Sequence, residues 1–304
     1  MKNDLVSISD LTLMDVNHLF DMTRSLKDGT NAKALNGKTL VLLFEKPSLR
    51  TRVTFEAGMT QLGGHAIYLA PGDIGLGVRE TVPDVAHNLE RWVDGIIART
   101  FQHETVVALA KNSTIPVVNA LSDLEHPCQA LADYFTILEQ KKSLTDLKVA
   151  YFGDGNNVCH SLILLSSIIG TNFVAACPKG YQPKSEIVET AHKNNSKSGG
   201  TLNIVEDPNE AARDADVVYT DVWVSMGEEA EREQKLKDLK GYQVNSELLS
   251  ACKDDVIVMH CLPAKRGLEI TDEVMDSEHS VVFDEAENRL HVQKAILVSL
   301  ITER

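Results

Sequence analysis

The stretch FEKPSLRTRVTFE, residues 44–56, gathers lysine, arginine, serine and threonine side chains around one proline. These side chains bind phosphate oxygens through charge-assisted hydrogen bonds. Ser48 is a favourable N-cap, and residues 49–62 have the apolar spacing of a helix that follows a strand-like run. The unpaired backbone N–H groups of that first turn would add donors for the same anion. The stretch therefore predicts a site for a small phosphate.

A simpler interpretation is that Ser48 only caps the helix and that the arginines pair with acids elsewhere. Against it, a cation at a helix N-terminus is unfavourable by about 0.3–1 kcal/mol unless an anion offsets it. The Walker pattern GxxxxGK[ST] is absent, so a nucleoside triphosphate is not the expected ligand. Arg50 and Arg52 would point to roughly opposite sides of a regular helix. We assign Arg50 to the phosphate and leave open whether Arg52 is structural.

Polar residues also follow later apolar runs in the first half of the chain. Arg99 follows DGIIA, at the strand end where α/β sheets bind ligands, although it could equally form a surface ion pair. In HPCQ, Pro127 favours a helix start, which places His126 and Gln129 on one side of the first turn. Taken alone, His126 would be an N-cap or a core histidine.

In the second half, GDGNN at residues 153–157 lies between a strand-like run and a helix. It resembles a dinucleotide-binding turn, but GxGxxG fails at Val158, and no clear ribose-binding acid follows the next strand. A nicotinamide enzyme is therefore the weaker alternative. In DVWVSMG, Asp221 could hold an ammonium group and the following residues could form a closing loop, or the segment could be an ordinary turn with a buried Trp223. Cys261 in HCLP could be a small buried hydrophobe, and Arg289 could be a surface charge.

Short apolar runs alternate with segments of helical period along most of the chain. This alternation predicts an α/β protein of two domains, each a parallel β-sheet covered by helices on both faces. A polar break places the domains at residues 1–140 and 141–304, with a terminal helix at about 286–304 that docks on the first domain. Residues 196–200 are expected to form a loop, and the charged residues 228–240 a solvated helix or loop.

The composition excludes several classes of partner. The formal net charge of −14 and the pI near 5.1 argue against nucleic acid and anionic membranes, since both favour basic surfaces. No apolar run has the length of a membrane span, and the first residues lack a signal or transit pattern. Five scattered cysteines without a CxxC pair, and histidines without HExxH spacing, indicate a reducing compartment and no zinc framework. We expect a cytoplasmic protein without a metal or cofactor.

The segment SLRTR at residues 48–52 resembles the carbamoyl-phosphate loop, usually STRTR, of the aspartate/ornithine carbamoyltransferase family. It departs from that loop at Leu49, where a backbone N–H contact would survive but a hydroxyl contact would not. HPCQ, GDGNN, DVWVSMG, HCLP and Arg289 resemble further family motifs in the same order, over residues 40–290. Among them, DxxxSMG is similar to the ornithine-recognition loop and differs from the pattern of the aspartate enzymes.

The resemblance implies transfer of the carbamoyl group from carbamoyl phosphate to the δ-amine of L-ornithine, giving L-citrulline and phosphate, as in arginine biosynthesis. The catalytic residues it implies are Arg99, His126, Cys261 and Asp221. The carbamoyl phosphate-binding residues it implies are Ser48, Leu49, Arg50, Thr51, Arg99, His126, Gln129, Cys261, Leu262 and Arg289. The ornithine-binding residues it implies are Asn157, Asp221, Ser225 and Met226.

The amine has to arrive neutral, although an alkylamine has a pKa of about 10.4 in water. Burial disfavours its ammonium form, and Asp221 with Cys261 could help to remove the proton. Whether Cys261 acts as a base or only as a contact is left open.

Two alternatives remain at this stage. One is a carbamoyltransferase for N-acetylornithine, N-succinylornithine or putrescine, and the other is a non-catalytic relative that binds carbamoyl phosphate without turnover. The resemblance also implies a homotrimer whose active sites receive a loop from the neighbouring subunit. Relatives commonly carry a glutamine in that loop, where this chain has Gly75. Further assembly of trimers, and an anabolic or catabolic role, stay open.

Overall fold

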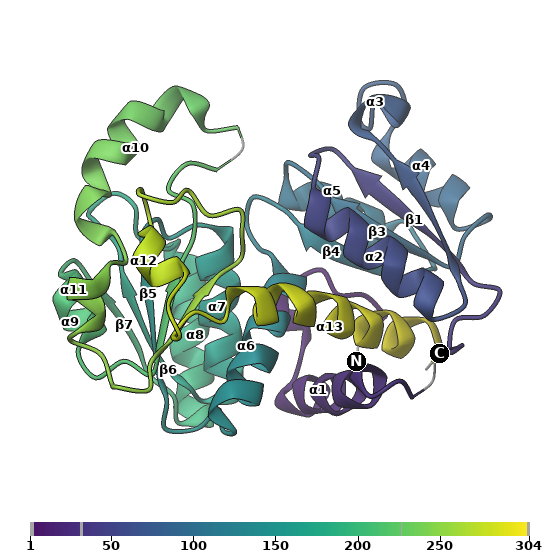
Figure 1. The fold of residues 1–304 in the computed structure, drawn as a ribbon. Coiled ribbons are helices and arrows are strands. Elements are labelled where there is room, and N and C mark those ends of the chain that lie inside the picture. Colours follow the sequence, from purple (N-terminus) through teal and green to yellow (C-terminus); the bar gives the residue numbers. More distant parts are fainter. Residues whose placement is uncertain (1–2, 31–32, 226, 303–304) are drawn as a thin grey trace. The chain divides into compact units, whose positions relative to one another are not determined.

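The computed structural model describes residues 3–30, 33–225 and 227–302 (Figure 1). The chain forms two compact units, unit 1 with Met1–Ala132 and Glu287–Arg304 and unit 2 with Asp133–Ala286. The sequence predicts domains at residues 1–140 and 141–304, with the terminal helix docked on the first domain. The division between the units falls inside two helices, α6 (Pro127–Lys141) and α13 (Val282–Thr302).

Unit 1 is built around a four-stranded parallel sheet in the order β2-β1-β3-β4. Its strands are β1 (Thr39–Phe44), β2 (His65–Leu69), β3 (Gly95–Arg99) and β4 (Val117–Leu121). From β1 the chain moves outward to β2 and then returns to the other side of β1, so the strand order reverses between β1 and β3. Ligands of α/β proteins bind at the carboxyl ends of the strands at such a reversal.

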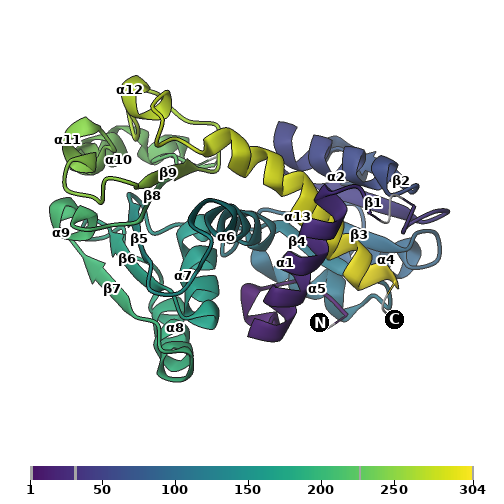
Figure 2. The same cartoon turned by 60° about the horizontal axis from the view of Figure 1, so that its bottom comes forward.

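Helices cover both faces of this sheet. Val41 and Ile96 point to one face and pack in a hydrophobic cluster with Leu89 and Leu109 of two covering helices. A third helix, α2, lies on the opposite face (Figure 2). The helices of unit 1, besides parts of α6 and α13, are the 3₁₀ helix η1 (Ile8–Asp10), α1 (Leu13–Lys27), α2 (Leu49–Gln61), α3 (Pro71–Ile74), α4 (Val82–Leu89) and α5 (His103–Lys111).

The C-terminal helix α13 runs beside α1 and α2, as both views show (Figures 1 and 2). The Lys27 ammonium donates to Asn288 Oδ1 at 2.8 Å, and the Lys294 ammonium donates to Gln61 Oε1 at 3.1 Å. The predicted docking of the terminal helix on the N-terminal domain is thereby confirmed. The helix begins at Val282, four residues before the predicted start.

Unit 2 contains a five-stranded parallel sheet in the order β7-β6-β5-β8-β9. Its strands are β5 (Lys148–Phe152), β6 (Asn172–Ala176), β7 (Leu202–Val205), β8 (Val217–Thr220) and β9 (Ile257–His260). The strand order reverses between β5 and β8. The second reversal therefore lies next to the turns that follow β5 and β8.

Phe152 and Val258 on one face of this sheet belong to a cluster with Ala211, Leu248 and Val274 of short helices. Two longer helices, α7 and α8, lie on the other face (Figure 2). The two-domain α/β fold predicted from the sequence is confirmed. The helices of unit 2, besides parts of α6 and α13, are α7 (Asn157–Ile169), α8 (Ser185–Ser198), α9 (Pro208–Ala212), η2 (Glu229–Glu231), α10 (Arg232–Asp238), η3 (Lys240–Tyr242), α11 (Ser246–Leu249) and α12 (Asp272–Met275).

One local prediction was wrong, and a second, a solvated helix or loop at residues 228–240, was confirmed except at its few buried residues. Residues 196–198, predicted as part of a loop, belong to α8, which ends at Gly199 in the left-handed conformation that glycine favours (φ 85°). Residues 228–240, predicted to be solvated, contain the buried Lys235, whose ammonium pairs with two carboxylates. Within the part of the chain that the structure describes, no helix is long and apolar enough to cross a membrane.

Candidate active site

The N-terminus of α2 forms the first part of the candidate site in unit 1. Ser48 is extended (φ −158°), and its hydroxyl accepts a hydrogen bond from the Thr51 backbone N–H at 3.2 Å. This is the predicted N-cap, and the helix starts at Leu49. Leu49, the first residue of the helix, is 74% exposed.

Arg52 makes an ion pair and a cation–π contact on the surface of α2. Its Nε donates to Glu56 Oε1 at 2.9 Å, and its guanidinium carbon lies 3.7 Å from the centroid of the Tyr68 ring. Lys46 likewise lies over an aromatic ring, with Nζ 4.8 Å from the centroid of Phe101. The positive charge of Arg52 is therefore balanced by the Glu56 carboxylate, one helical turn later in α2.

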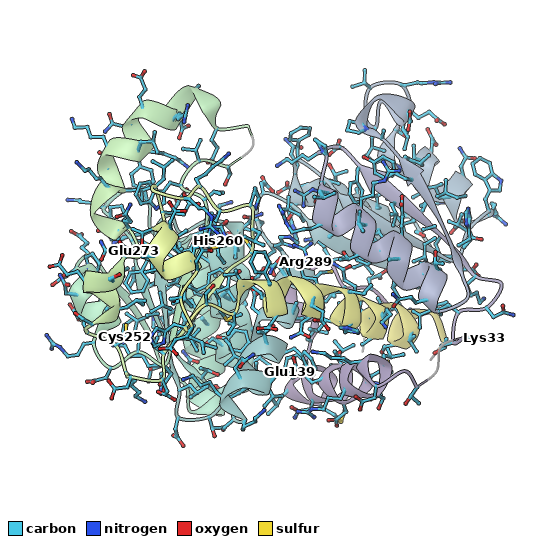
Figure 3. All side chains as sticks on the ribbon, in the orientation of Figure 1. Lys33, Glu139, Cys252, His260, Glu273 and Arg289 are labelled. Carbon is cyan, nitrogen blue, oxygen red and sulfur yellow. The ribbon has the colours of Figure 1, made fainter. Side chains whose placement is uncertain are left out.

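Arg289 connects two other predicted site residues. Its side chain is buried on α13, where Figure 3 labels it, and only 3% of the residue is exposed. One terminal nitrogen donates to Gln129 Oε1 at 2.5 Å and the other to Thr51 Oγ1 at 2.8 Å. Residues far apart in the sequence therefore meet around one guanidinium group.

His126 and Arg99 complete this cluster of unit 1. Both are buried, Arg99 as the last residue of β3 and His126 immediately before α6. Burial, together with the charges of Arg289, Arg99 and Arg50, keeps the pKa of His126 well below its usual 6.5. The imidazole is neutral at pH 7, surrounded by three guanidinium charges. A cluster of this kind suits a small, multiply charged anion even though the whole chain is acidic.

In unit 2, the turn at residues 153–156 depends on its glycines. Gly153 has φ 131°, a conformation that other residues rarely adopt. A Cβ on Gly155 would lie 2.4 Å from the backbone nitrogen of Pro183, which leaves no room for a side chain. The turn ends at Asn156, whose Oδ1 caps α7 by accepting from the N–H groups of Val158 and Cys159 at 2.9 and 3.1 Å.

Asn156 also orients Asp221, which the sequence analysis missed. Its amide nitrogen donates to Asp221 Oδ2 at 2.8 Å, so one side chain joins the turn after β5 to the turn after β8. The sequence analysis assigned the neighbouring Asn157, which opens α7. The signal for Asn156 was its place at the N-cap, where asparagine is strongly favoured. The role of Asn157 as a ligand stays a prediction.

Asp221 and Cys261 form a direct contact. The Cys261 thiol donates to Asp221 Oδ1 at 3.0 Å, and the Val222 N–H donates to the same oxygen at 2.7 Å. Burial, and then the adjacent Asp221 carboxylate, raise the pKa of Cys261 well above 9.0. At neutral pH Cys261 is therefore a protonated thiol that donates to the carboxylate, and a thiolate base is absent from this arrangement.

His260, labelled in Figure 3 at the end of β9, supports the segment that carries Cys261 and Leu262. Its Nδ1 accepts from the Leu262 N–H at 2.9 Å, so the proton is on Nε2, which lies 3.2 Å from Glu269 Oε1. Asp221, His260 and Cys261 offer ligand atoms within 4.8 Å of one another, a spacing that could hold a metal ion. Both His260 nitrogens already contact Glu269 and the Leu262 N–H, and the Cys261 thiol donates to Asp221, so these ligand atoms are already used in hydrogen bonds.

Ser225 follows Asp221 in the same loop. Its backbone N–H donates to Glu228 Oε2 at 2.9 Å. Met226, the remaining predicted ornithine ligand, lies outside the described residues.

Polar side chains thus gather at the carboxyl ends of the strands in each unit. Unit 1 presents guanidinium, hydroxyl and helix N-terminal donors, and unit 2 presents a fixed carboxylate. The groups of unit 1 suit an anionic ligand, and the carboxylate of unit 2 suits a cationic ligand.

Residues 3–139 match the model of "Aspartate/ornithine carbamoyltransferase, carbamoyl-P binding domain", and residues 145–300 match that of the family's "Asp/Orn binding domain". The chain belongs to the aspartate/ornithine carbamoyltransferase family.

Similar proteins span the whole chain. The ornithine carbamoyltransferase of Methanosarcina acetivorans is 53% identical over 99% of this chain and 100% of its own length. The anabolic enzyme of Pyrococcus furiosus and the catabolic enzyme of Thermoplasma acidophilum are each 49% identical, over 97% and 99% of this chain and 95% and 99% of their own lengths. Among solved structures, ornithine carbamoyltransferase from Pyrococcus furiosus has a TM-score of 0.95 at 48% identity, covering 99% of this chain and 97% of that chain. That from Thermus thermophilus has a TM-score of 0.91 at 46% identity, covering 99% and 100%.

Proposed function

We propose that this protein transfers the carbamoyl group of carbamoyl phosphate to the δ-amine of L-ornithine, producing L-citrulline and phosphate. Relatives that are similar over nearly the whole chain and are named ornithine carbamoyltransferase support the proposal. The structural observation that carries it is the Asp221 carboxylate, held from two sides by Asn156 and Cys261. A buried carboxylate held by two hydrogen bonds is a suitable partner for the ammonium group of a basic amino acid.

In unit 1, we assign phosphate binding to Ser48, Leu49 through its backbone, Arg50 and Thr51. Phosphate is the leaving group, so donors that stabilise its charge lower the barrier to breaking its bond to the carbonyl carbon. The buried position of Thr51 and its contact with Arg289 support this assignment.

Arg99, His126 and Gln129 are assigned to the carbamoyl group itself. The carbonyl oxygen gains negative charge when the amine attacks, and fixed donors at that oxygen stabilise the transition state. A neutral His126 can donate from its ring without adding a fourth positive charge to the cluster. Arg289 is assigned to the same end of the ligand, where it holds the Gln129 amide oxygen.

In unit 2, we assign ornithine binding to Asn157, Asp221, Ser225 and Met226. The δ-ammonium has to lose a proton before its nitrogen can attack the carbonyl carbon. Because the Cys261 thiol already carries its own proton, we assign Cys261 and Leu262 to substrate contacts and Asp221 to the first acceptance of the ornithine proton.

The assembly is proposed to be a homotrimer in the cytoplasm. The exposed apolar side chains of unit 1 support an interface, and all five cysteines are free thiols, as expected in a reducing compartment. Light scattering after gel filtration should give a mass of three chains of 33.4 kDa or a multiple of that mass. A single-chain mass at assay concentration would contradict the proposal. The exposed apolar residues of unit 1 include Leu49, Val53, Ile67, Val78, Trp92 and Phe101.

The decisive assay compares amines with carbamoyl phosphate as the common donor. Ornithine should give the highest kcat/KM, ahead of N-acetylornithine, N-succinylornithine and putrescine, and Asp221→Asn should remove most of that activity. A higher kcat/KM with another amine would replace ornithine as the substrate. Binding of carbamoyl phosphate without turnover of any amine would favour a non-catalytic protein.

A further inference from the structure

Lys235 on α10 is a buried cation inside a segment that is otherwise strongly charged and exposed. Its side chain is only 4% exposed. The ammonium donates to Asp154 Oδ2 at 2.7 Å and to Glu228 Oε2 at 2.6 Å, and it lies 5.9 Å from the centroid of the Tyr181 ring. Burial disfavours the ammonium form, but the hydrogen bonds to both carboxylates outweigh burial and raise the pKa of Lys235. Lys235 is therefore a charged bridge within the fold.

The two carboxylates belong to different turns. Glu228 Oε2 also accepts the Ser225 backbone N–H at 2.9 Å, so the Lys235 bridge reaches the loop that follows Asp221. Asp154 lies in the turn at residues 153–156, and its carbonyl oxygen accepts from the Tyr151 hydroxyl at 2.8 Å.

The turn at residues 153–156 also contacts Asp221, the carboxylate assigned to ornithine. The Asn156 N–H contacts the Asp154 carbonyl oxygen at 2.7 Å, and the Asn156 side chain donates to Asp221. The contacts thus run from the Ser225 backbone through Glu228, Lys235 and the residues 153–156 to the carboxylate assigned to ornithine. Without the ammonium, two acidic side chains would share a partly desolvated position, and their repulsion would separate the turns.

We propose that Lys235 is a positioning residue for the amino-acid substrate, which holds the Ser225 backbone and the Asn156–Asp221 pair in one arrangement. The proposal rests on the proposed function in placing ornithine at Asp221. It assigns no contact with carbamoyl phosphate, because every link named here lies in unit 2.

The kinetic test uses Lys235→Met, which keeps the length of the side chain and removes its charge. The KM for ornithine should rise by about tenfold or more, whereas the KM for carbamoyl phosphate should stay within about twofold of the wild-type value. Lys235→Arg should recover most of the loss, because a guanidinium can also bridge two carboxylates. Lys253→Met is the matched control, since Lys253 pairs with Asp216 at 2.7 Å in the same unit and should leave both KM values unchanged.

A spectroscopic test needs no substrate. Trp223 is buried against the turn, with its Cδ1 atom 3.5 Å from the position that a Cβ on Gly153 would occupy, whereas the only other tryptophan, Trp92, is 71% exposed. In a Trp92→Phe background, Lys235→Met should shift the Trp223 emission to longer wavelength, and Lys253→Met should not.

The outcomes separate the two proposals. A lower melting temperature with both KM values and the Trp223 emission unchanged would overturn the positioning role, and so would equal rises in both KM values. A shifted emission in a protein whose wild type makes no citrulline would count against the proposed function, while the positioning of the two turns would stand.

Discussion

Burial changes the chemistry of individual candidate residues in each unit. His126 is neutral among guanidinium groups, and Cys261 is a protonated thiol beside a carboxylate. In each case desolvation is the largest cause and nearby charges act in the same direction. The proposed roles follow from these states, with His126 as a donor and Cys261 as a contact.

Acidification should destabilise the folded protein through His126. A histidine whose folded-state pKa is depressed stays neutral when folded but takes up a proton when unfolded. Its contribution is therefore present above about pH 6.5 and is lost as the pH falls, by about 1.4 kcal/mol per pH unit until the folded-state pKa is reached. Denaturant titrations at pH 7 and pH 5 measure this change. His126→Gln should lose less stability than the wild type over that interval, while a His65→Gln variant at an exposed position should follow the wild type.

Arg289→Met should weaken the use of carbamoyl phosphate. The substitution removes two charge-assisted hydrogen bonds that organise Thr51 and Gln129, and hydrogen bonds to charged groups contribute about 1.5–3 kcal/mol. We expect kcat/KM for carbamoyl phosphate to fall by about 10²-fold. Arg24→Met, which removes an exposed ion pair with Asp21, is the control and should keep wild-type kinetics. Wild-type kinetics in Arg289→Met would contradict the assignment of Arg289 to carbamoyl phosphate binding.

At the scale of secondary-structure elements, the site residues lie where strands end and helices begin. The N-terminus of α2 lies beside β1, and the turn before α7 supplies Asn156 beside β5. Parallel sheets bring such element ends to one edge, so the topology positions groups that are distant in the sequence.

Two N-caps with the same hydrogen-bond pattern allow a structural role to be separated from a ligand role. The Ser48 and Thr81 hydroxyls each accept the N–H of the residue three positions later, at 3.2 and 3.3 Å. Replacement of either by alanine should cost about 1 kcal/mol of stability. Only Ser48→Ala should also raise the KM for carbamoyl phosphate, because α4, which Thr81 caps, carries none of the assigned residues. If the KM for carbamoyl phosphate is unchanged in both variants, Ser48 caps the helix and does not bind the substrate.

The turn before α7 should not tolerate a side chain at Gly155. A Cβ there would lie 2.4 Å from Pro183 N and 2.7 Å from the Gln182 carbonyl carbon, so the backbone would have to move. Gly155→Ala should lower the free energy of unfolding by about 1–3 kcal/mol and weaken ornithine binding through Asn156. Gly241→Ala, where nothing lies within 4 Å of the added Cβ, should be neutral or slightly stabilising. Equal stability of both variants would contradict this packing.

At the scale of the whole molecule, an acidic chain of net charge −14 concentrates guanidinium groups at one small site in unit 1. Local charge, and not net charge, therefore decides the ligand. A phosphonate bisubstrate analogue that joins the carbamoyl phosphate and ornithine portions should stabilise the protein by about 2.7 kcal/mol at a concentration of 100 times its Kd.

Thermal unfolding with and without the analogue measures this stabilisation. Arg289→Met and Asp221→Asn should each reduce the shift, because each removes a group assigned to one portion of the analogue. If the analogue raises the melting temperature of both variants as much as that of the wild type, neither residue contributes to its binding.

The sequence by itself determined the class of fold and most of the candidate residues. Alternation of apolar runs with helical periods is a local property, and it was sufficient to predict parallel sheets covered by helices. Ser48 as an N-cap and Pro127 at the start of a helix were also readable, since capping depends on a few neighbouring residues. The positions predicted for the end of α8 and the start of α13 were less accurate, because helix ends depend on packing.

Only the tertiary structure decided which distant side chains meet and which groups lose water. Arg289 reaches Thr51 across 238 residues of sequence, and Asn156 reaches Asp221 across 65. No local pattern distinguished Lys235 from its solvated neighbours, because its burial depends on Asp154 in another turn. Desolvation and the pairing of charges are properties of the folded chain, so protonation states and positioning contacts emerge only when the strands and helices are assembled.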